Sequence, residues 1–463
     1  MNDDIILELR NALGENNCLT GDQLISRYVH IWKMNEGLQA KCVVLPLTTD
    51  DVSMIMKICD KYNQHVVVHG GLTNLVGSTE TIGDEVVIAM ERLNKVEEVD
   101  VGSRTITAQA GVILEHIIDS ADANDLLFPM NFGAKGSAQI GGVVSTNAGG
   151  LKVFKYGMTR NLVLGLEAVL PNGTIVSSLK KIIKDNAAYD IKQLFIGSEG
   201  TLGIVTKVVL RLVEKPKSRV SGLVGLNDYS KVVSLLKYLD KSLGGNLSSF
   251  ELIWGRTYKM MTSPPATNKP PIPHGYKYYV LFESLGSHQE KDAKHFETVV
   301  TQAMELGLFE DGTIAQNSSD LNWFWNIRED VHVIASQCDN DQHFDISLPI
   351  PLIGEYVDDV LSKLDDSPNV QGAYPFGHVA DGNIHFIVGK EEQTQELINH
   401  VNDIIYAPLS SKGGSVSAEH GIGLHKKRYL QLCRSEEEIA LMKALKMSLD
   451  PQNLLNRGKV LDV

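Results

Sequence analysis

Three segments rich in glycine, serine and threonine constrain this chain most, because each lies beside short runs of β-branched residues. They are VVVHGGLTNLVGS at 66–78, AKGSAQIGGVVSTNAGG at 134–150 and IGSEGTLGIVT at 196–206. Glycine lets a ligand approach the backbone, and successive N–H groups can form an anion-binding nest. Any one segment alone is equally typical of a structural turn. Together they predict the loops of one domain around a large, extended cofactor that contains phosphate.

The spacing within these segments excludes two common nucleotide sites. The first segment lacks the Gly-Lys-Ser/Thr of a Walker loop, and it is not a G-x-G-x-x-G that opens a helix, so a Rossmann NAD site is unsupported. FAD fits the three segments better than a nucleoside triphosphate does, because nothing supplies a P-loop lysine.

A chain of 463 residues is long enough for two or three domains. The short β-branched runs alternate with helical patterns such as 50–62 and 114–124, which favours an α+β domain. Pro216, among basic residues, marks a boundary, after which helices (229–243 and 289–306) alternate with strands. Helices are also expected at 435–448 and 451–455. The predicted parts are an N-terminal helical segment (1–38), two domains (39–217 and 218–420) and a C-terminal helical segment (421–463).

Composition narrows the partners and the compartment. The net charge of −14 argues against nucleic acid or an anionic membrane as the main partner, although a small acid can still bind to local cations. The five cysteines (Cys18, Cys42, Cys59, Cys338 and Cys433) include no C-x-x-C, which argues against an iron–sulfur module or a disulfide framework. The first residues do not resemble a signal peptide, and no apolar run reaches the length of a membrane span, so we expect a cytoplasmic protein.

Two histidines flank a turn signal in PFGHVADGNIHF at 375–386, and SAEHGIG follows at 417–423. If Asp381-Gly382 forms a two-residue hairpin turn, His378 and His385 are opposed, with Cβ atoms about 5 Å apart on one face. Two histidines and one carboxylate are a common ligand set for a catalytic divalent metal. The alternative is a pair of buried, hydrogen-bonded histidines on a sheet.

These segments occur in the order typical of a known family. HGGLTNLVGS, AKGSAQIGGVVSTNAGG, IGSEGTLGIVT, GHVADGNIH and SAEHGIG together resemble the FAD-linked oxidases of the vanillyl-alcohol-oxidase type, over roughly residues 40–460. The branch that the chain resembles most holds D-2-hydroxyglutarate and D-lactate dehydrogenases. The resemblance implies an α+β fold. Its parts are a two-subdomain FAD-binding domain (39–217), a substrate or cap domain with an antiparallel sheet (218–420) and a C-terminal helical segment that returns to the FAD domain.

The resemblance also implies which residues contact FAD. Some family members attach flavin through a histidine directly after the Gly-Gly pair, and Leu72 stands there, so non-covalent FAD is expected. His69 precedes the pair and is expected to be a structural histidine, while Asn74 and Ser78 replace glycines. The implied contacts are Gly70, Gly71, Leu72, Thr73, Asn74, Gly77, Ser78, Pro129, Gly136, Ser137, Gly141, Gly142, Thr146, Asn147, Gly149, Gly150, Glu199, Gly200, Ile204, Val205 and Asn456.

The resemblance assigns the chemistry to the last two motifs. It implies that His378, His385 and Glu419 bind one divalent metal, Zn or Mn, and that His420 is the base. Adjacent residues of a strand point to opposite faces, so Glu419 and His420 can serve one site only from an irregular turn.

Substrate binding is implied for Arg328, in WFWNIRED, and for Asn383, each toward a substrate carboxylate. A surface salt bridge with Glu329 or Asp330 is the alternative for Arg328. D-2-hydroxyglutarate enzymes usually carry Thr and Lys where this chain has His332 and His343, which leaves recognition of a distal carboxylate open.

The implied reaction is the oxidation of a D-2-hydroxy acid to the 2-oxo acid, with the hydride passing to flavin N5 and the proton to His420. Electrons would then leave for a separate acceptor, a quinone or an electron-transfer flavoprotein. Two other functions stay open: a non-catalytic flavin subunit of a glycolate-oxidase-type complex, and an aryl-alcohol or aldonolactone oxidase. A homodimer is one option that the sequence leaves open.

Overall fold

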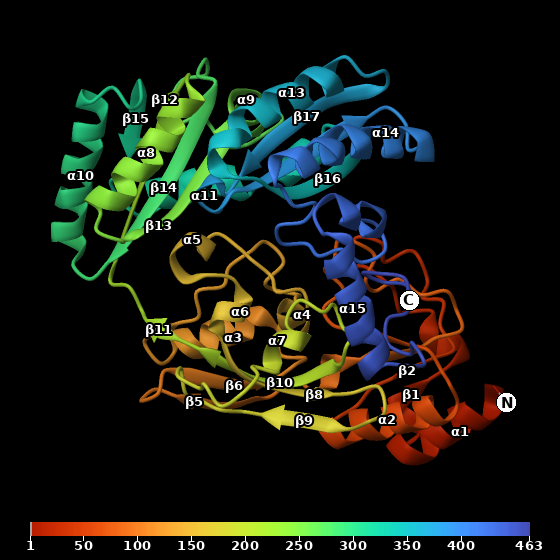
Figure 1. Ribbon diagram of the computed structural model, residues 1–463. Coiled ribbons are helices and arrows are strands. Elements are labelled where there is room, and N and C mark those ends of the chain that lie inside the picture. The colour runs from red at the N-terminus through yellow and green to blue at the C-terminus, as the bar shows by residue number, and fades with distance from the viewer. Residues whose placement is uncertain (1) are drawn as a thin grey trace. The chain divides into compact units, whose positions relative to one another are not determined.

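The computed structural model describes residues 2–463, and the chain divides into two compact units (Figure 1). The first unit contains the described residues of Met1–Gly150 together with Tyr156–Lys215 and Glu419–Val463. The second unit contains Leu151–Lys155 and Pro216–Ala418. Within residues 2–463, no helix combines the length and the apolar character that crossing a membrane requires.

The described strands of the first unit form three sheets, a four-stranded one (β1-β2-β4-β3), a five-stranded one (β5-β6-β10-β8-β9) and the pair β11-β7. Strands β2, β4 and β3 are parallel, whereas the five-stranded sheet is antiparallel. The strands are β1 (Cys18–Leu19), β2 (Cys42–Val44), β3 (Val66–His69), β4 (Val86–Ala89), β5 (Val96–Asp100), β6 (Thr105–Gln109), β7 (Leu126–Leu127), β8 (Val163–Val169), β9 (Ile175–Ser178), β10 (Ile204–Arg211) and β11 (Val213–Glu214).

One helix of the first unit begins at a clear local capping signal. Helix α2 (Thr49–Lys61) starts after Thr48, whose side chain accepts the N–H of Asp51 in a capping box. The other helices are α1 (Asn2–Leu13), α3 (Leu114–Asp122), α4 (Ile140–Ser145), α6 (Thr159–Leu162), α7 (Lys192–Phe195), α15 (Glu436–Leu449) and the 3-10 segments η1 (Glu15–Asn17), η2 (Gly21–Leu24), η3 (Met90–Arg92) and η7 (Lys427–Leu432). Helix α5 (Val153–Tyr156) lies where the chain passes from the second unit back to the first.

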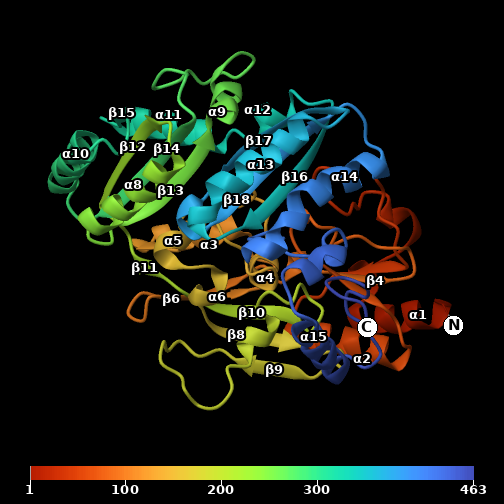
Figure 2. The ribbon, with the colours of Figure 1, turned by 45° about the horizontal axis from the view of Figure 1, so that its top comes forward.

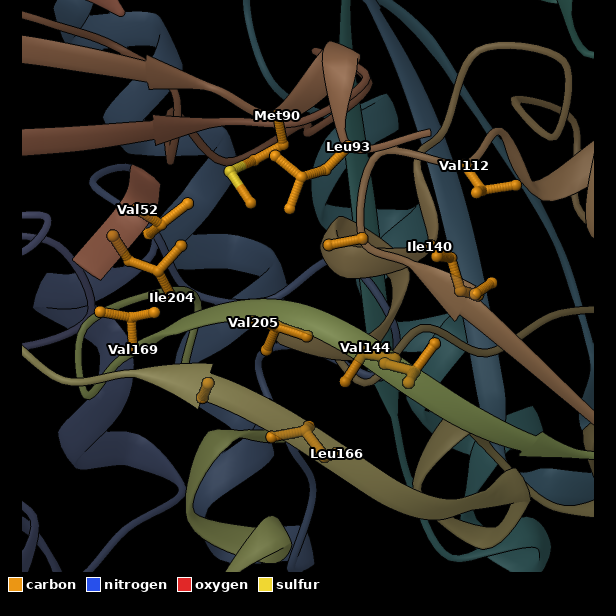
Figure 3. Close-up of a cluster of buried hydrophobic side chains, with 14 of the residues drawn as sticks. Val52, Met90, Leu93, Val112, Ile140, Val144, Leu166, Val169, Ile204 and Val205 are labelled. Carbon is orange, nitrogen blue, oxygen red and sulfur yellow. The ribbon is translucent and has the colours of Figure 1, made fainter. Parts of the chain in front are cut away.

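Two of the glycine-rich segments share one hydrophobic core. Figure 3 shows Ile140 and Val144 of α4 near Val205 of β10, with Leu166 of β8 beside them. All four side chains are at most 4% exposed. The core therefore fixes 134–150 and 196–206 against each other, as expected for loops that serve one ligand.

Two predicted helical stretches differ in the structure. Residues 1–38 were expected to be helical, but after α1 they form only short 3-10 segments, β1 and irregular chain. Residues 451–455 form a turn instead of a helix, because the Asp450 carboxylate accepts the N–H groups of Leu454 and Leu455 and Leu455 bridges to Val66. Intrinsic propensity is overridden here by one buried carboxylate.

His69, at the end of β3, gives a pH-dependent contribution to stability. Burial lowers the pKa of His69 from 6.5 to about 4, and its Nε2 lies 2.9 Å from the Thr79 carbonyl oxygen. Below pH 6.5, His69 becomes protonated in the unfolded chain but stays neutral in the folded chain until the pH nears 4. The free energy of unfolding therefore falls as the pH falls. We expect this group to cost about 2 kcal/mol between pH 7 and pH 5. Urea unfolding of the wild type and His69→Gln at both pH values measures this, and equal losses in the two proteins would contradict it.

The described strands of the second unit form one antiparallel sheet of seven, in the order β15-β12-β14-β13-β17-β18-β16. They are β12 (Ser218–Leu226), β13 (Leu247–Trp254), β14 (Tyr278–Gly286), β15 (Asp311–Ile314), β16 (Asn340–Ser347), β17 (Val370–Gly377) and β18 (Asn383–Lys390). The helices are α8 (Tyr229–Ser242), α9 (Gly255–Thr262), α10 (Gln289–Glu305), α11 (Ser318–Glu329), α12 (His332–Ala335), α13 (Ile353–Asp365), α14 (Gln395–Tyr406), η4 (Ile350–Leu352), η5 (Val379–Asp381) and η6 (Ala407–Lys412).

Different helices cover the two faces of this sheet, as Figures 1 and 2 both show. On one face aromatic residues of the strands meet α10, α13 and α14, for example Phe282 against Phe296 and Phe386 against Tyr356. On the other face α9, α11 and α12 pack on residues such as Ile253. Side chains alternate along a strand, so this second face also carries Glu251, two residues before Ile253. The polar residues described next lie on this face.

Candidate active site

The histidine pair forms, but not through the predicted hairpin. Strand β17 ends at Gly377 and β18 begins at Asn383, and His385 is paired with Phe376. His378 therefore lies in the connection, and the predicted opposition of His378 and His385 in the ladder is wrong. The two rings still lie with centroids 5.3 Å apart at 88°.

Backbone hydrogen bonds explain the longer connection. The carbonyl of His378 accepts the N–H groups of Asp381 and Asn383, at 3.1 and 3.3 Å, which winds the chain into the 3-10 turn η5. Gly382 then adopts φ +85°, and a Cβ there would lie 2.5 Å from the Leu348 carbonyl oxygen. Asp381-Gly382 does lie in a turn, but the turn is not a two-residue hairpin loop. It is longer, and hydrogen bonds to the His378 carbonyl close it.

Each imidazole has a fully buried carboxylate near its Nδ1. His378 Nδ1 lies 2.7 Å from Glu251 Oε1, and His385 Nδ1 lies 3.8 Å from Asp345 Oδ1. Burial alone would raise the pKa of Glu251, but the charges of His378 and Arg328 and their hydrogen bonds hold it below its usual value. Only the His378 contact is short enough for a hydrogen bond. Metal-binding histidines commonly donate one ring N–H to a carboxylate in this way and leave the other nitrogen for the ion. Sequence reasoning missed both carboxylates.

Arg328, at the end of α11, is buried and is not the surface residue of the alternative interpretation. It is 5% exposed, and its Nε donates to Glu251 Oε2 at 2.7 Å. Its guanidinium lies 4.8 Å from the centroid of the Phe376 ring. Arg328 and His378 thus contact the same carboxylate, and the predicted substrate arginine lies beside the histidine pair.

Asn383 presents an unpaired oxygen. Its Nδ2 donates to Asp345 Oδ1 at 2.8 Å and to the Ile346 carbonyl at 2.9 Å, so both amide protons are used. Its Oδ1 is buried and finds no partner among residues 2–463. The unpaired atom is an acceptor, which suits a hydroxyl donor or a cation. A contact with a substrate carboxylate, as the resemblance implies, would need Nδ2 to release one of its present acceptors.

Asp345 also holds the end of the second unit. Its Oδ2 accepts Ser417 Oγ at 3.2 Å and the Ala418 N–H at 3.0 Å. The next residue along the chain is Glu419.

The two other predicted substrate residues lie in the same unit. His332 begins α12, and His343 lies on β16, where its ring Nε2 contacts the Asp341 carboxylate. In the ladder with β18, Asp345 is opposite His385 and His343 is opposite Ile387, so His343 is on the face that carries Asp345 and His385.

In the first unit, Glu199 fixes the turn that follows His420. Its carboxylate accepts the N–H groups of Ile422 and Gly423, at 2.7 and 2.9 Å, and the hydroxyl of Ser78 at 2.7 Å. Burial raises the pKa of Glu199. Gly421 and Gly423 have φ of +86° and +50°, so the irregular turn expected after Glu419 and His420 is present.

Asn456 connects two of the predicted FAD segments. Its Oδ1 accepts the Val68 N–H at 3.2 Å, and its Nδ2 donates to the Glu199 carbonyl at 2.7 Å. The side chains of Glu199 and Asn456 are therefore engaged within the protein, and both residues hold loops in position.

The glycine loops have the shape and the unpaired groups that a bound cofactor requires. A Cβ on Gly71 would lie 2.0 Å from the Ser137 carbonyl oxygen, whereas one on Gly142 would meet nothing within 4 Å. Within residues 2–463, Asn74 Nδ2 and Gln139 Oε1 are buried without a partner. Leu72 has φ +56°, a strained angle for a bulky residue. The loops are packed on each other on one side and carry unused polar atoms, which fits FAD.

The first unit carries three glycine-rich loops, and the second carries a histidine pair, two buried carboxylates and a buried arginine. This combination is typical of a flavin-dependent enzyme of two parts. Two family descriptions match: "FAD binding domain" over residues 40–178 and "FAD linked oxidases, C-terminal domain" over residues 215–460. The chain belongs to the FAD-linked oxidase family.

Curated relatives cover nearly the whole chain. D-2-hydroxyglutarate dehydrogenase, mitochondrial, of Arabidopsis thaliana is 36% identical over 98% of this chain and 80% of its own length. The protein of the same name from Danio rerio is 34% identical over 98% and 85%. A D-2-hydroxyglutarate–pyruvate transhydrogenase of Saccharomyces cerevisiae is 35% identical over 92% and 88%.

Solved structures confirm the fold. p-Cresol methylhydroxylase superposes with a TM-score of 0.78 at 16% identity, covering 99% of this chain and 97% of its own. Alkyldihydroxyacetonephosphate synthase gives 0.76 at 15% identity, covering 98% and 84%. The predicted α+β fold of the vanillyl-alcohol-oxidase type is confirmed, as is the resemblance to the FAD-linked oxidases.

The predicted cytoplasmic location is contradicted. The relatives from Arabidopsis thaliana, Danio rerio and Rattus norvegicus are named mitochondrial. The prediction depended on the lack of a signal-peptide pattern and of an apolar run as long as a membrane span, and neither absence encodes a compartment.

Proposed function

We propose that this protein is an FAD-dependent, metal-assisted dehydrogenase that oxidises a D-2-hydroxy acid, with D-2-hydroxyglutarate as the first candidate and D-lactate as the second. The observation that carries the proposal is the buried cluster in which His378 and Arg328 contact the same Glu251 carboxylate. It combines a metal-type histidine with a cation suited to a carboxylate. The names of the relatives support the choice of substrate.

His378 and His385 would hold the metal, Zn or Mn, through Nε2, since Nδ1 of each faces a carboxylate. Glu419 would be the third ligand. It follows Ala418, whose N–H is held by Asp345, and consecutive Cα atoms are only about 3.8 Å apart. Such an ion supplies Lewis acidity that lowers the pKa of a bound hydroxyl group.

His420 would take the hydroxyl proton, because a histidine is the side chain best matched to a base near neutral pH. Arg328 would bind the C1 carboxylate, which lies next to the reacting C2. The unpaired Oδ1 of Asn383 would accept a hydrogen bond from the substrate hydroxyl. His332 and His343 would contact the far end of the substrate.

FAD would be held non-covalently by the first unit, with Leu72 at the position where some family members attach it, and it supplies the hydride acceptor. The boundaries 39–217 and 218–420 would then separate cofactor binding from substrate binding. Electrons would pass to a quinone or an electron-transfer flavoprotein, because the cysteines provide no cluster of their own. A non-catalytic flavin subunit would have no need to keep this histidine set.

Anaerobic reduction of the flavin tests the proposal directly. D-2-hydroxyglutarate should bleach the flavin absorbance, D-lactate should do so more slowly, and L-2-hydroxyglutarate should not. Prior removal of the metal with EDTA should slow the bleaching at least about 100-fold, because the lost Lewis acid is worth several kcal/mol. Zn²⁺ or Mn²⁺ should restore it.

Dithionite is the control, since it reduces flavin without the substrate site. Dithionite bleaching that is intact, together with no response to D-2-hydroxyglutarate, D-lactate, D-malate or glycolate, would refute a D-2-hydroxyacid dehydrogenase. Bleaching by a D-2-hydroxy acid that EDTA does not slow would refute the role of the metal but not the dehydrogenase activity.

A further inference from the structure

One buried carboxylate in the second unit connects two groups of different chemistry. Glu251, on β13, is 1% exposed and accepts Arg328 Nε on Oε2 and His378 Nδ1 on Oε1, each at 2.7 Å. Its partners come from the end of α11 and from the connection between β17 and β18. Glu251 lies 77 residues before Arg328 and 127 residues before His378. No local sequence pattern can therefore predict these contacts.

We propose that Glu251 is a positioning residue that fixes the metal-binding atom of His378 and the carboxylate-binding edge of Arg328 relative to each other. This inference rests on the proposed function and deepens it. It assigns to a residue outside the recognised motifs the coupling between the metal and the substrate carboxylate.

The histidine half of the proposal follows from tautomers. A carboxylate can only accept, so His378 Nδ1 must carry the proton that it shares with Glu251. The lone pair of a neutral ring is then on Nε2, the atom that a metal needs. The contact also fixes the rotation of the ring, and losses of such supporting contacts typically weaken metal binding about 10- to 100-fold.

The arginine half follows from the shape of the guanidinium. Glu251 engages Nε, which leaves the edge formed by Nη1 and Nη2 for a second carboxylate in the bidentate arrangement that arginine favours. The Phe376 ring, 4.8 Å from the guanidinium, restricts its plane. The charge of Glu251 also offsets one of the positive charges gathered there, so the arginine stays buried without a substrate.

A second buried glutamate in the same sheet gives a matched control, although its arginine partner is exposed. Glu283, on the neighbouring strand β14, is 0% exposed, pairs with Arg219 Nε and accepts Ser248 Oγ at 2.9 Å. Like Glu251, it pairs with an arginine Nε, but its hydrogen bonds and ion pair within residues 2–463 reach no histidine. Glu283→Gln removes the same charge without changing a contact of Glu251, His378 or Arg328.

The test compares Glu251→Gln with Glu283→Gln in the FAD-loaded protein. Glutamine has one acceptor oxygen and one amide donor. If its oxygen serves Arg328, its NH₂ donates to His378 Nδ1 and moves the ring proton to Nε2. We expect Glu251→Gln to bind Zn²⁺ about 10- to 100-fold more weakly, measured by competition with a chromophoric chelator, and to raise KM for D-2-hydroxyglutarate about 10-fold. Glu283→Gln should change neither quantity more than about twofold.

The outcomes separate this inference from the proposed function. If the wild type binds no Zn²⁺, or if His378→Ala binds it equally well, the metal site of the proposed function fails. If His378→Ala loses Zn²⁺ but Glu251→Gln keeps wild-type affinity, the inference alone is overturned. Weaker Zn²⁺ binding with an unchanged KM overturns the arginine half. Should Glu251→Gln not fold with FAD, Glu251→Asp keeps the charge but not the reach, and an unchanged Zn²⁺ affinity there would overturn the inference too.

Discussion

His420→Ala is expected to retain bound FAD and to lose reduction of the flavin by D-2-hydroxyglutarate, with a rate lower by roughly 10²- to 10⁴-fold, the usual contribution of a general base. The fold should tolerate the change, because the turn after His420 is fixed by other atoms. Glu199 accepts the N–H groups of Ile422 and Gly423, and Val76 accepts that of Leu424. Stopped-flow absorbance of the flavin under anaerobic conditions measures the rate.

His425→Ala provides the matched control. His425 follows in the same segment, but its ring is exposed and pairs with Glu80 at 3.0 Å. Its rate of flavin reduction should stay within about twofold of the wild type. A His420→Ala protein that reduces its flavin at the wild-type rate would remove His420 from the role of base and would point to another acceptor for the proton.

Arg328→Lys is expected to lower kcat/KM for D-2-hydroxyglutarate about 100-fold, mainly through KM. Lysine keeps the charge but has no planar fork, so it can satisfy Glu251 or the substrate but not both. Because Arg328 is assigned to the C1 carboxylate, which D-lactate also has, the loss should be similar for both substrates. Steady-state kinetics with an artificial electron acceptor give both values.

Arg219→Lys is the control for Arg328→Lys, since Arg219 pairs with the buried Glu283 in the same sheet. Its kinetics should not change. A loss that is confined to D-2-hydroxyglutarate would instead place Arg328 at the distal carboxylate and would overturn its assignment to C1.

Local patterns were enough to predict many elements and the positions of the glycine-rich loops. The β-branched run at Val66–Val68 forms β3, and Thr48 with Asp51 begins α2 as a capping signal should. Pattern failed where one tertiary contact outweighed propensity, as at 451–455, where Asp450 takes two backbone N–H groups. It failed again at His378, where the histidine's own carbonyl accepts two N–H groups and lengthens the connection.

The sequence by itself determined which chemical groups this protein has and in what order: three glycine loops, an arginine, two histidines and a Glu-His pair. Those follow from residue type and short spacing, which local sterics and hydrogen bonding govern. Only the tertiary structure decided which carboxylates meet the histidines. Glu251 reaches His378 and Arg328 because β13 pairs with β17 and α11 covers that face of the sheet. Strand pairing over such separations depends on the packing of the whole sheet, so no local pattern encodes it.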